Sequence, residues 1–368
     1  MIISEVDRSG FPRGYTPLTS PTELRLIILE RGSSVDLIRC TLRNTHLDSE
    51  PYESLSYEWG QPDHKDLSII VNGWKFPVRK NLYDALLHLR KKDGYRCMWI
   101  DALCIDQESH EEKSHRVRLM GKIYEGAEKV IVWLGLSNAD SDSALDMIQD
   151  IQGLSEIKGL NGSHSFPESF TVSKHSAIGR IYRRYWYNKH GGAHLDDEPQ
   201  WPESEDRRMK AVLSLLTRPY WRRIWIVQEI RLAQRLSFHC GSRSISSLAL
   251  NDFRCFVNSF RSSVVGWLKG LESEQSLMEL KGTFALRLLG RKGEESEPRR
   301  LRAWLHECIR LECICSEPRD FVYALLGLSE DCQNGDLIPD YEKDLIDVYY
   351  DAKAVCFRDQ TMAYVSDE

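Results

Sequence analysis

The chain has 368 residues, of which 42% are hydrophobic and 10% aromatic, so it can form one large globular domain or two average ones. Its formal net charge of -6 provides no general attraction for nucleic acid or for an anionic membrane surface, and no local basic patch stands out. The N-terminus has no apolar signal core, and the longest apolar run, Val130 to Leu136, is too short to span a bilayer. Ten scattered cysteines are typical of reduced thiols. We therefore expect a cytoplasmic protein with no membrane span and no nucleic-acid partner.

The first hundred residues have the pattern of strands followed by a helix. Four regions rich in large apolar and β-branched residues predict strands, namely 24–29, 37–42, 53–57 and a pair around the hairpin signal Asn72-Gly73. Apolar side chains at helical spacing then predict a helix over 81–89. The run 97–101, which follows Gly94, predicts a further strand.

The middle of the chain alternates between helix and strand. A helix is predicted over 115–127, and the apolar run 129–134 is typical of a strand that is buried on both faces. A strand, a helix and a strand in this order imply a parallel sheet. Between about 153 and 206 the periodicity is lost, which favours a polar insertion that is partly loop.

After the insertion the pattern becomes mainly helical. We predict a helix over 209–216, a tryptophan-rich helix over 219–230 and a strand over 236–240. Four more helices are predicted toward the end of the chain, at 252–260, 301–311, 321–328 and 344–357.

The tryptophan-rich segment is the most informative stretch of the sequence. Pro219 suits the first helical position, and helical spacing then places Trp221, Trp225 and Glu229 on one face. A carboxylate beside aromatic planes suits a flat, charged ring as ligand. The alternative is that both tryptophans are core residues and that Glu229 is a surface acid paired with a neighbouring arginine.

Residues that directly follow predicted strands are candidates for a site, because ligands of α/β sheets bind beyond the carboxyl ends of the strands. Asp101 and Asp106 suit contacts with ribose hydroxyls or general acid-base work, or else they order a helix start or a loop. Cys104 is either a nucleophile or, since no histidine is paired with it in the sequence, a small buried hydrophobe. We predict a substrate-binding role for these three residues and for Tyr57, Trp59 and Gly60. For Gly60 the structural alternative is a turn.

Several common catalytic motifs are absent from the sequence. It contains no G-x-G-x-x-G, P-loop, G-x-S-x-G or H-E-x-x-H pattern, which argues against Rossmann-type redox chemistry, NTP hydrolysis, α/β-hydrolase chemistry and zinc proteolysis. His190 and His194 are four residues apart, but the two glycines between them disfavour the helix that would align them as metal ligands. We expect no metal and no cofactor.

The order of several motifs along the chain is more informative than any one of them. These motifs are Tyr52–Gly60, Asn81–Leu86, Trp99–Gln107, Ile123–Ala127, Val132–Gly135, Trp221–Glu229, Pro318–Leu328 and Pro339–Tyr341. Together they resemble the fungal heterokaryon incompatibility (HET) domain, over about residues 15–341. One departure is Asp106, where the family pattern usually has asparagine.

The resemblance has consequences for activity. HET domains are regarded as distant relatives of TIR domains, several of which cleave NAD at the nicotinamide glycosidic bond with a glutamate from a W-x-x-x-E helix. Trp225, Glu229 and Ile230 are similar to that motif. By this resemblance, Glu229 is the catalytic residue that stabilises positive charge as the bond breaks, and Trp225 packs near the nicotinamide ring. NAD is then a substrate, and activity depends on self-association.

The expected fold is therefore an α/β, TIR-like parallel sheet flanked by helices, with an N-terminal β-rich extension and a helical C-terminal region. The HET core is predicted at 15–250, with the polar insertion at about 153–206, and the helical region at 251–368. The resemblance implies a cell-death effector of fungal non-self recognition, with NAD or a related nucleotide and an incompatibility protein as partners. One alternative is a non-catalytic signalling module, and another is a HET-like fold that acts on an unrelated small molecule.

Overall fold

The structure is a computed structural model, and it describes residues 15–61, 67–156, 203–259, 272–290, 300–332, 335 and 337–365. The chain divides into two compact units, each built from separate stretches of sequence. Unit 1 comprises 1–136, 219–242 and 291–368, whereas unit 2 comprises 137–218 and 243–290. The predicted division of the chain near residue 250 stays a prediction.

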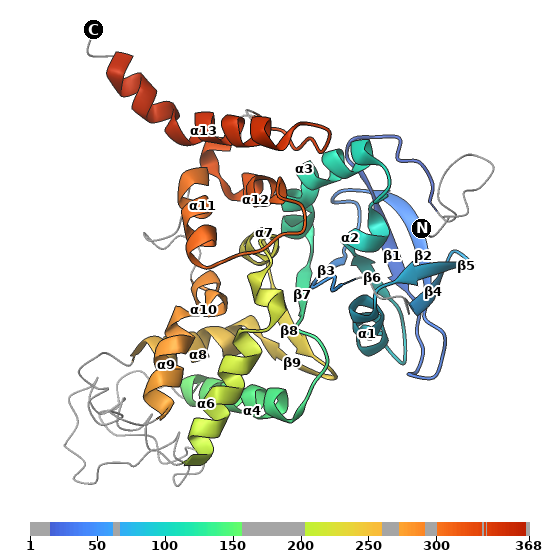
Figure 1. The fold of residues 1–368 in the computed structure, drawn as a ribbon. Coiled ribbons are helices and arrows are strands. Elements are labelled where there is room, and N and C mark those ends of the chain that lie inside the picture. Colours follow the sequence, from blue (N-terminus) through green and yellow to red (C-terminus); the bar gives the residue numbers. More distant parts are fainter. Residues whose placement is uncertain are drawn as a thin grey trace. The chain divides into compact units, whose positions relative to one another are not determined.

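The strands of unit 1 form one mixed sheet. In chain order they are β1 (Glu23–Leu29), β2 (Arg39–His46), β3 (Glu53–Tyr57), β4 (Leu67–Val71), β5 (Trp74–Val78), β6 (Arg96–Trp99), β7 (Lys129–Trp133) and β8 (Leu236–Cys240). Their spatial order is β5-β4-β2-β1-β6-β3-β7-β8, which can be followed in Figure 1. This sheet with its flanking helices confirms the expected α/β fold.

The sheet has a parallel part and a mainly antiparallel part. Neighbours β6, β3, β7 and β8 run parallel, so that Ser54 lies opposite both Trp99 and Val130 in register. In contrast, β1 pairs antiparallel with both β2 and β6. The parallel strands correspond to the predicted core, and the others to the predicted N-terminal β-rich extension. All carboxyl ends of the parallel strands therefore meet at one edge of the sheet.

Helices cover the sheet of unit 1. The helical elements of this unit are α1 (Lys80–Leu89), α2 (Asp101–Cys104), α3 (His110–Gly126), η2 (Pro219–Arg222), α7 (Ile226–Arg231), α11 (Leu301–Arg310), α12 (Asp320–Tyr323), η4 (Leu326–Leu328), η5 (Glu330–Cys332) and α13 (Leu345–Val365). The long helix α3 begins where the Ser109 hydroxyl accepts a hydrogen bond of 3.2 Å from the Glu112 amide, which satisfies a backbone donor that has no partner within the helix.

The core of unit 1 lies around the parallel strands. β7 is apolar along nearly its whole length because both faces of the sheet are covered there. Trp99 and Trp133 are 1% and 0% exposed, and the ring of Trp221 stacks on Phe238 at 5.9 Å between centroids. The core is therefore rich in aromatic side chains next to the strand ends.

The prediction of one continuous helix over 219–230 is wrong. The segment is divided into the 3-10 turn η2 and the short helix α7, and the residues between them pair with another part of the chain. The Ile314 amide donates to the Arg222 carbonyl at 2.6 Å, and the Ile224 amide donates to the Ile314 carbonyl at 3.1 Å. These bonds interrupt the helix between Trp221 and Trp225. Trp225 keeps helical backbone angles and its carbonyl accepts from the Glu229 amide at 3.2 Å, so Trp225 and Glu229 remain one helical turn apart, as predicted, and only Trp221 is separated from them.

Unit 2 is mainly helical. Its described elements are α4 (Ala139–Glu156), α6 (Glu203–Leu216), β9 (Arg243–Ser246), α8 (Ser247–Ser259), α9 (Glu272–Gly282) and α10 (Phe284–Leu288). Helix α4 packs against both α6 and α8 (Figure 1). Most of the predicted insertion at 153–206, with His190 and His194, lies outside the described residues.

Candidate functional site

A cavity of about 570 Å³ opens in unit 1 beyond the carboxyl ends of β3 and β6. It is lined by residues from several stretches of the chain that are far apart in sequence, including the loop after β3, the start of α2 and the segment 314–320. This is the edge of a parallel sheet at which α/β proteins bind ligands. The volume falls within the range of small-molecule sites.

The loop after β3 forms the first wall and contains Trp59 and Gly60. Gly60 has a φ of +73°, a left-handed conformation that glycine adopts without strain, so the turn explains the residue type. Its carbonyl accepts a 2.5 Å hydrogen bond from the Arg79 guanidinium, which also lies 5.5 Å from the centroid of the Trp59 ring. Trp59 is therefore held by the chain in a fixed position at the cavity.

Asp101 is the first residue of α2, which follows β6, and its side chain contacts this loop. One of its carboxylate oxygens accepts a 2.8 Å bond from the Trp59 indole, and the other accepts a 2.7 Å bond from the Ala102 amide. Burial raises the pKa of Asp101, while the nearby Arg223 opposes that rise. Trp59, Gly60 and Asp101 were all predicted as site residues, and all three line this cavity.

Arg223 connects the cavity to a buried polar cluster. Its guanidinium donates to the Glu229 carboxylate at 3.4 and 3.5 Å, and Glu229 also accepts a hydrogen bond from the Ser56 hydroxyl. The Ser56 oxygen lies 2.6 Å from the Tyr220 hydroxyl. Burial raises the pKa of Glu229, and the positive charge of Arg223 opposes this effect. Burial alone would lower the pKa of Arg223, but Glu229 and Asp101 raise it.

Glu229 is 1% exposed and is not among the residues that line the cavity. Arg223 does line it, so in this arrangement the guanidinium stands between the Glu229 carboxylate and the cavity. Trp225 lines the cavity as predicted, from the N-terminal end of α7 and one helical turn before Glu229.

Another wall of the cavity comes from the C-terminal part of unit 1. Trp225 donates its indole N–H to Asp320 Oδ2 at 3.0 Å, and the Tyr341 hydroxyl donates to Asp320 Oδ1 at 2.6 Å. The ammonium of Lys113 lies 4.1 Å from the centroid of the Tyr341 ring. Burial raises the pKa of Asp320, and the two hydrogen bonds oppose that rise. A fixed carboxylate thus faces the cavity beside an indole.

Three predicted site residues, Tyr57, Cys104 and Asp106, do not line the cavity. Tyr57 is 2% exposed and belongs to the core. The Cys104 thiol is 1% exposed, accepts from the Ile100 amide at 3.4 Å, and has a pKa that burial raises to about 12. Such a thiol is protonated at neutral pH, so the structural alternative describes Cys104 better than a nucleophile does.

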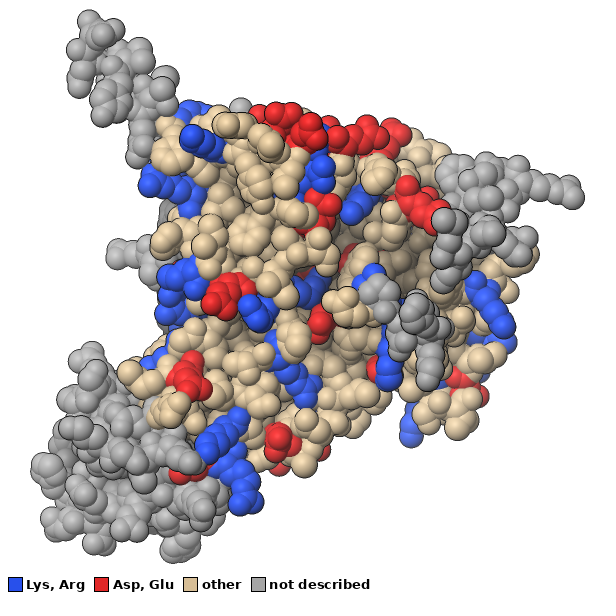
Figure 2. All heavy atoms as spheres, in the orientation of Figure 1, with Lys and Arg blue, Asp and Glu red and all other residues tan. Residues whose placement is uncertain are grey.

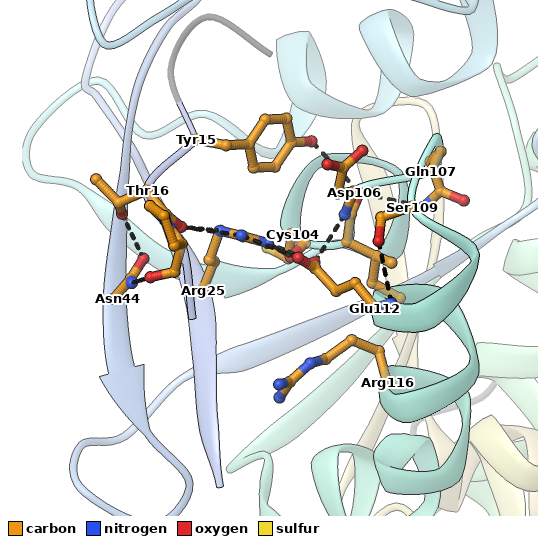
Figure 3. Close-up of polar contacts among 12 residues, drawn as sticks. Tyr15, Thr16, Arg25, Asn44, Cys104, Asp106, Gln107, Ser109, Glu112 and Arg116 are labelled. Atoms are coloured by element: carbon orange, nitrogen blue, oxygen red, sulfur yellow. Dashed lines mark hydrogen bonds and ion pairs between the residues drawn. The ribbon is translucent and has the colours of Figure 1, made fainter. Parts of the chain in front are cut away.

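Asp106 belongs to a separate polar network (Figure 3). Its carboxylate accepts from the Glu108 amide at 3.1 Å, while its own amide donates to Glu112 at 2.9 Å. Glu112 also pairs with the buried Arg25 at 2.5 Å. These contacts tie the α2–α3 loop to β1, which agrees with the loop-ordering alternative for Asp106.

Sequence reasoning missed several cavity residues. Arg223 lies inside the tryptophan-rich segment but was not singled out, and Arg79 and Lys113 gave no local signal. Asp320 and Tyr341 lie in motifs that carried the family resemblance, although no site role was inferred for them. These residues are far apart along the chain, and a single sequence shows no spacing of residue types that would predict their contact in the folded protein.

The comparisons with known proteins identify the family. Residues 52–229 match the model of the family described as Heterokaryon incompatibility protein (HET). The match begins at Tyr52, directly before β3, and ends at Glu229 in α7. Residues 52–229 of the chain therefore form a HET domain, as the order of the motifs predicted.

A similar protein is the Neurospora crassa "Heterokaryon incompatibility protein 6, OR allele", which is 28% identical over 345 residues. The alignment covers 87% of this chain and 49% of that protein, so the chain spans about half the length of the curated relative it matches. No solved structure matches the chain.

Proposed function

We propose that this chain acts in heterokaryon incompatibility as a cell-death effector that cleaves NAD to nicotinamide and ADP-ribose products. The family match and the name of the Neurospora relative support the biological role. The observation that carries the chemical part is the cavity at the carboxyl edge of the sheet, where two indoles, three cationic side chains and fixed carboxylates meet.

The cavity offers a group for each part of a dinucleotide. The indoles of Trp59 and Trp225 suit stacking with a flat ring. Arg79, Lys113 and Arg223 suit the negative charges of a pyrophosphate. The Asp101 carboxylate suits acceptance from ribose hydroxyls.

The proposed reaction needs little proton transfer. The nicotinamide of NAD is a cationic leaving group, so the bond to ribose breaks without a proton donor, and a nearby carboxylate stabilises the positive charge that develops on the ribose. Water then adds to the ribose carbon and loses a proton, so that NAD and water give nicotinamide, ADP-ribose and a proton. In this proposal Glu229 supplies the carboxylate.

For direct contact with ribose, Arg223 must first turn away from Glu229. Its two bonds to Glu229, 3.4 and 3.5 Å, are longer than the usual 2.7–2.9 Å of charge-assisted hydrogen bonds. A pyrophosphate in the cavity competes for the same guanidinium. We propose that ligand binding, together with self-association, moves Arg223 toward the phosphates and uncovers Glu229.

The first test measures nicotinamide release from NAD by the purified chain, both dilute and concentrated or crowded. We expect release that increases with self-association and falls by about a hundredfold or more in Glu229→Gln, because transition-state charge stabilisation is worth several kcal/mol. Gln is preferable to Ala because it keeps the volume of the side chain and an acceptor for Ser56. Circular dichroism should show the same fold for both proteins, and Cys104→Ala should retain activity as the matched control.

A non-catalytic signalling module is the second candidate, and the burial of Glu229 favours it. A carboxylate that is 1% exposed and bonded to Ser56 and Arg223 has the contacts of a structural ion pair. In that case the cavity receives a regulatory ligand or a partner side chain, and cell death follows from recruitment of another protein. Absence of nicotinamide release in every self-associated state, with cell killing retained by Glu229→Gln, would establish this candidate instead.

A further inference from the structure

We propose that Asp320 is the residue that binds a ribose of the nucleotide, by accepting hydrogen bonds from its two neighbouring hydroxyls. This inference rests on the proposed function only in taking the ligand to be a nucleotide. Asp320 lies outside the residues 52–229 that match the family model. The binding site would then be completed by a segment beyond that match.

The hydrogen bonds of the Asp320 carboxylate leave acceptor positions for the two neighbouring hydroxyls of a ribose. Tyr341 donates to one carboxylate oxygen at 2.6 Å, and Trp225 donates to the other at 3.0 Å. Because an ionised carboxylate offers about four acceptor positions, each oxygen keeps a free position for one more donor. Both existing donors are neutral, so the negative charge is not cancelled by a direct ion pair with them. Two hydroxyls on adjacent ribose carbons match this pair of acceptors.

The rotamer of Asp320 is fixed before any ligand arrives. Tyr341 is 8% exposed, its ring contacts Tyr323 at 5.5 Å between centroids, and Lys113 lies over its face. Trp225 is held in the break between η2 and α7, where the backbone pairs with Ile314. The carboxylate therefore loses little conformational freedom on binding, which favours affinity.

Other carboxylates near the cavity are less suited to this role. Glu229 is 1% exposed and lies behind Arg223. Asp101 is 9% exposed, and its oxygens are bonded to Trp59 and to the backbone at the start of α2. Glu317 lines the cavity but pairs with Arg319 at 2.6 Å. Asp101 also accepts from two neutral donors and suits the second ribose of a dinucleotide, but it is buried and lies near the positive charge of Arg223, whereas Asp320 is only partly buried at the cavity.

The test compares binding of ADP-ribose with that of two analogues, one lacking the 2′-hydroxyl of the terminal ribose and one lacking that of the adenosine ribose. Titration calorimetry needs no catalysis and shows which ribose is bound. We expect the wild-type chain to bind ADP-ribose about tenfold or more tightly than one of the analogues, as is typical of a hydrogen bond to a charged group. In Asp320→Asn the ratio of the two affinities, that for ADP-ribose divided by that for this analogue, should fall to about one.

The controls separate ribose recognition from loss of structure. Glu317→Gln and Glu58→Gln change other carboxylates of the same cavity and should keep the wild-type ratio. Tyr341→Phe removes one donor to Asp320 and should lower the ratio only in part. A defect of folding weakens binding of all three compounds alike, so it does not change the ratio between them.

The outcomes for this inference and for the proposed function are distinguishable. A ratio that is retained in Asp320→Asn overturns the inference even if the chain cleaves NAD. The inference is equally overturned if the wild-type chain binds none of the three compounds, or binds them equally. A ratio that depends on Asp320, in a chain that releases no nicotinamide, supports the ribose site and removes only the catalytic part of the proposed function.

Discussion

At the scale of single residues, the pair of Arg223 and Glu229 decides how the candidate site works. A buried ion pair contributes little net stability, but removing one partner leaves an uncompensated charge that costs about 3–5 kcal/mol. Here Glu229 has Ser56 as a further partner, and Arg223 has the charge of Asp101 nearby. A Glu229→Ala variant would therefore lose stability as well as any catalytic role. This is why an isosteric substitution is the sharper test of function.

His239 gives a prediction for the dependence of stability on pH. Burial, together with Arg96 and Lys129, lowers the pKa of His239 from 6.5 to about 4, while Glu53 opposes that shift. Between these two values the unfolded chain binds a proton that the folded chain does not bind, so stability decreases as pH falls from 6.5 to 4. Above 6.5 the residue adds no pH dependence.

The check is urea unfolding at pH 7, 5.5 and 4.5 for the wild-type chain and His239→Gln. Gln keeps a polar group within reach of Ser237, whose hydroxyl lies 3.0 Å from the His239 ring. We expect the unfolding midpoint to fall less steeply with decreasing pH in the variant. Identical slopes in the two proteins would contradict the assignment of this pH dependence to His239.

At the scale of elements, short helices are positioned by their partners rather than by their own sequence. The tryptophan-rich segment has helical spacing, yet the pairing of its middle residues with Ile314 divides it. Strands were predicted more reliably, since β3, β6, β7 and β8 overlap the apolar runs that indicated them. Helix α4, in contrast, was not predicted, although acidic residues occur in its first turn and apolar ones farther along.

The packing of η4 on α3 depends on two glycines. A Cβ at Gly327 would collide with the side-chain oxygen of Gln228, which is 2% exposed, and would lie 3.5 Å from the Cα of Gly121. We expect Gly327→Ala to destabilise the chain by about 1–3 kcal/mol, because the buried Gln228 or the η4 segment must shift. Denaturant unfolding measures this loss.

Gly282→Ala is the matched control for that substitution. A Cβ at Gly282 meets nothing within 4 Å, and the residue ends helix α9, where alanine is a better helix former than glycine. Its stability should be unchanged or slightly higher. If both variants lost the same stability, the close approach of η4 and α3 would not be the cause.

At the scale of the whole molecule, unit 1 is closed by its own C-terminal segment. Val322 and Leu325 are 0% exposed, and the 314–320 stretch supplies both a backbone pair for Arg223 and one wall of the cavity. Basic and acidic side chains are interspersed over much of the face drawn in Figure 2. Among the helices that the structure describes, none has the length and apolar character needed to cross a bilayer.

A chain that ends at Gly290 tests this closure while keeping unit 2 whole. We expect a lower thermal midpoint than that of the full chain and increased binding of an apolar dye, because the removal of Val322 and Leu325 exposes the core surface beneath them. Circular dichroism and dye fluorescence measure the two effects. An unchanged midpoint would show that residues 291–368 are not needed to cover the core of unit 1.

The resemblance to the HET family, the α/β class and the strand ends at which Trp59, Gly60 and Asp101 lie could all be predicted from the amino-acid sequence. These features follow from local hydrophobic patterns and from the order of motifs, which a single chain displays directly. The three-dimensional structure was needed to show that Glu229 is buried behind Arg223, that Cys104 and Asp106 lie outside the cavity, and that Asp320 completes its lining. Those outcomes depend on contacts between distant segments, whose packing and hydrogen bonds override local spacing.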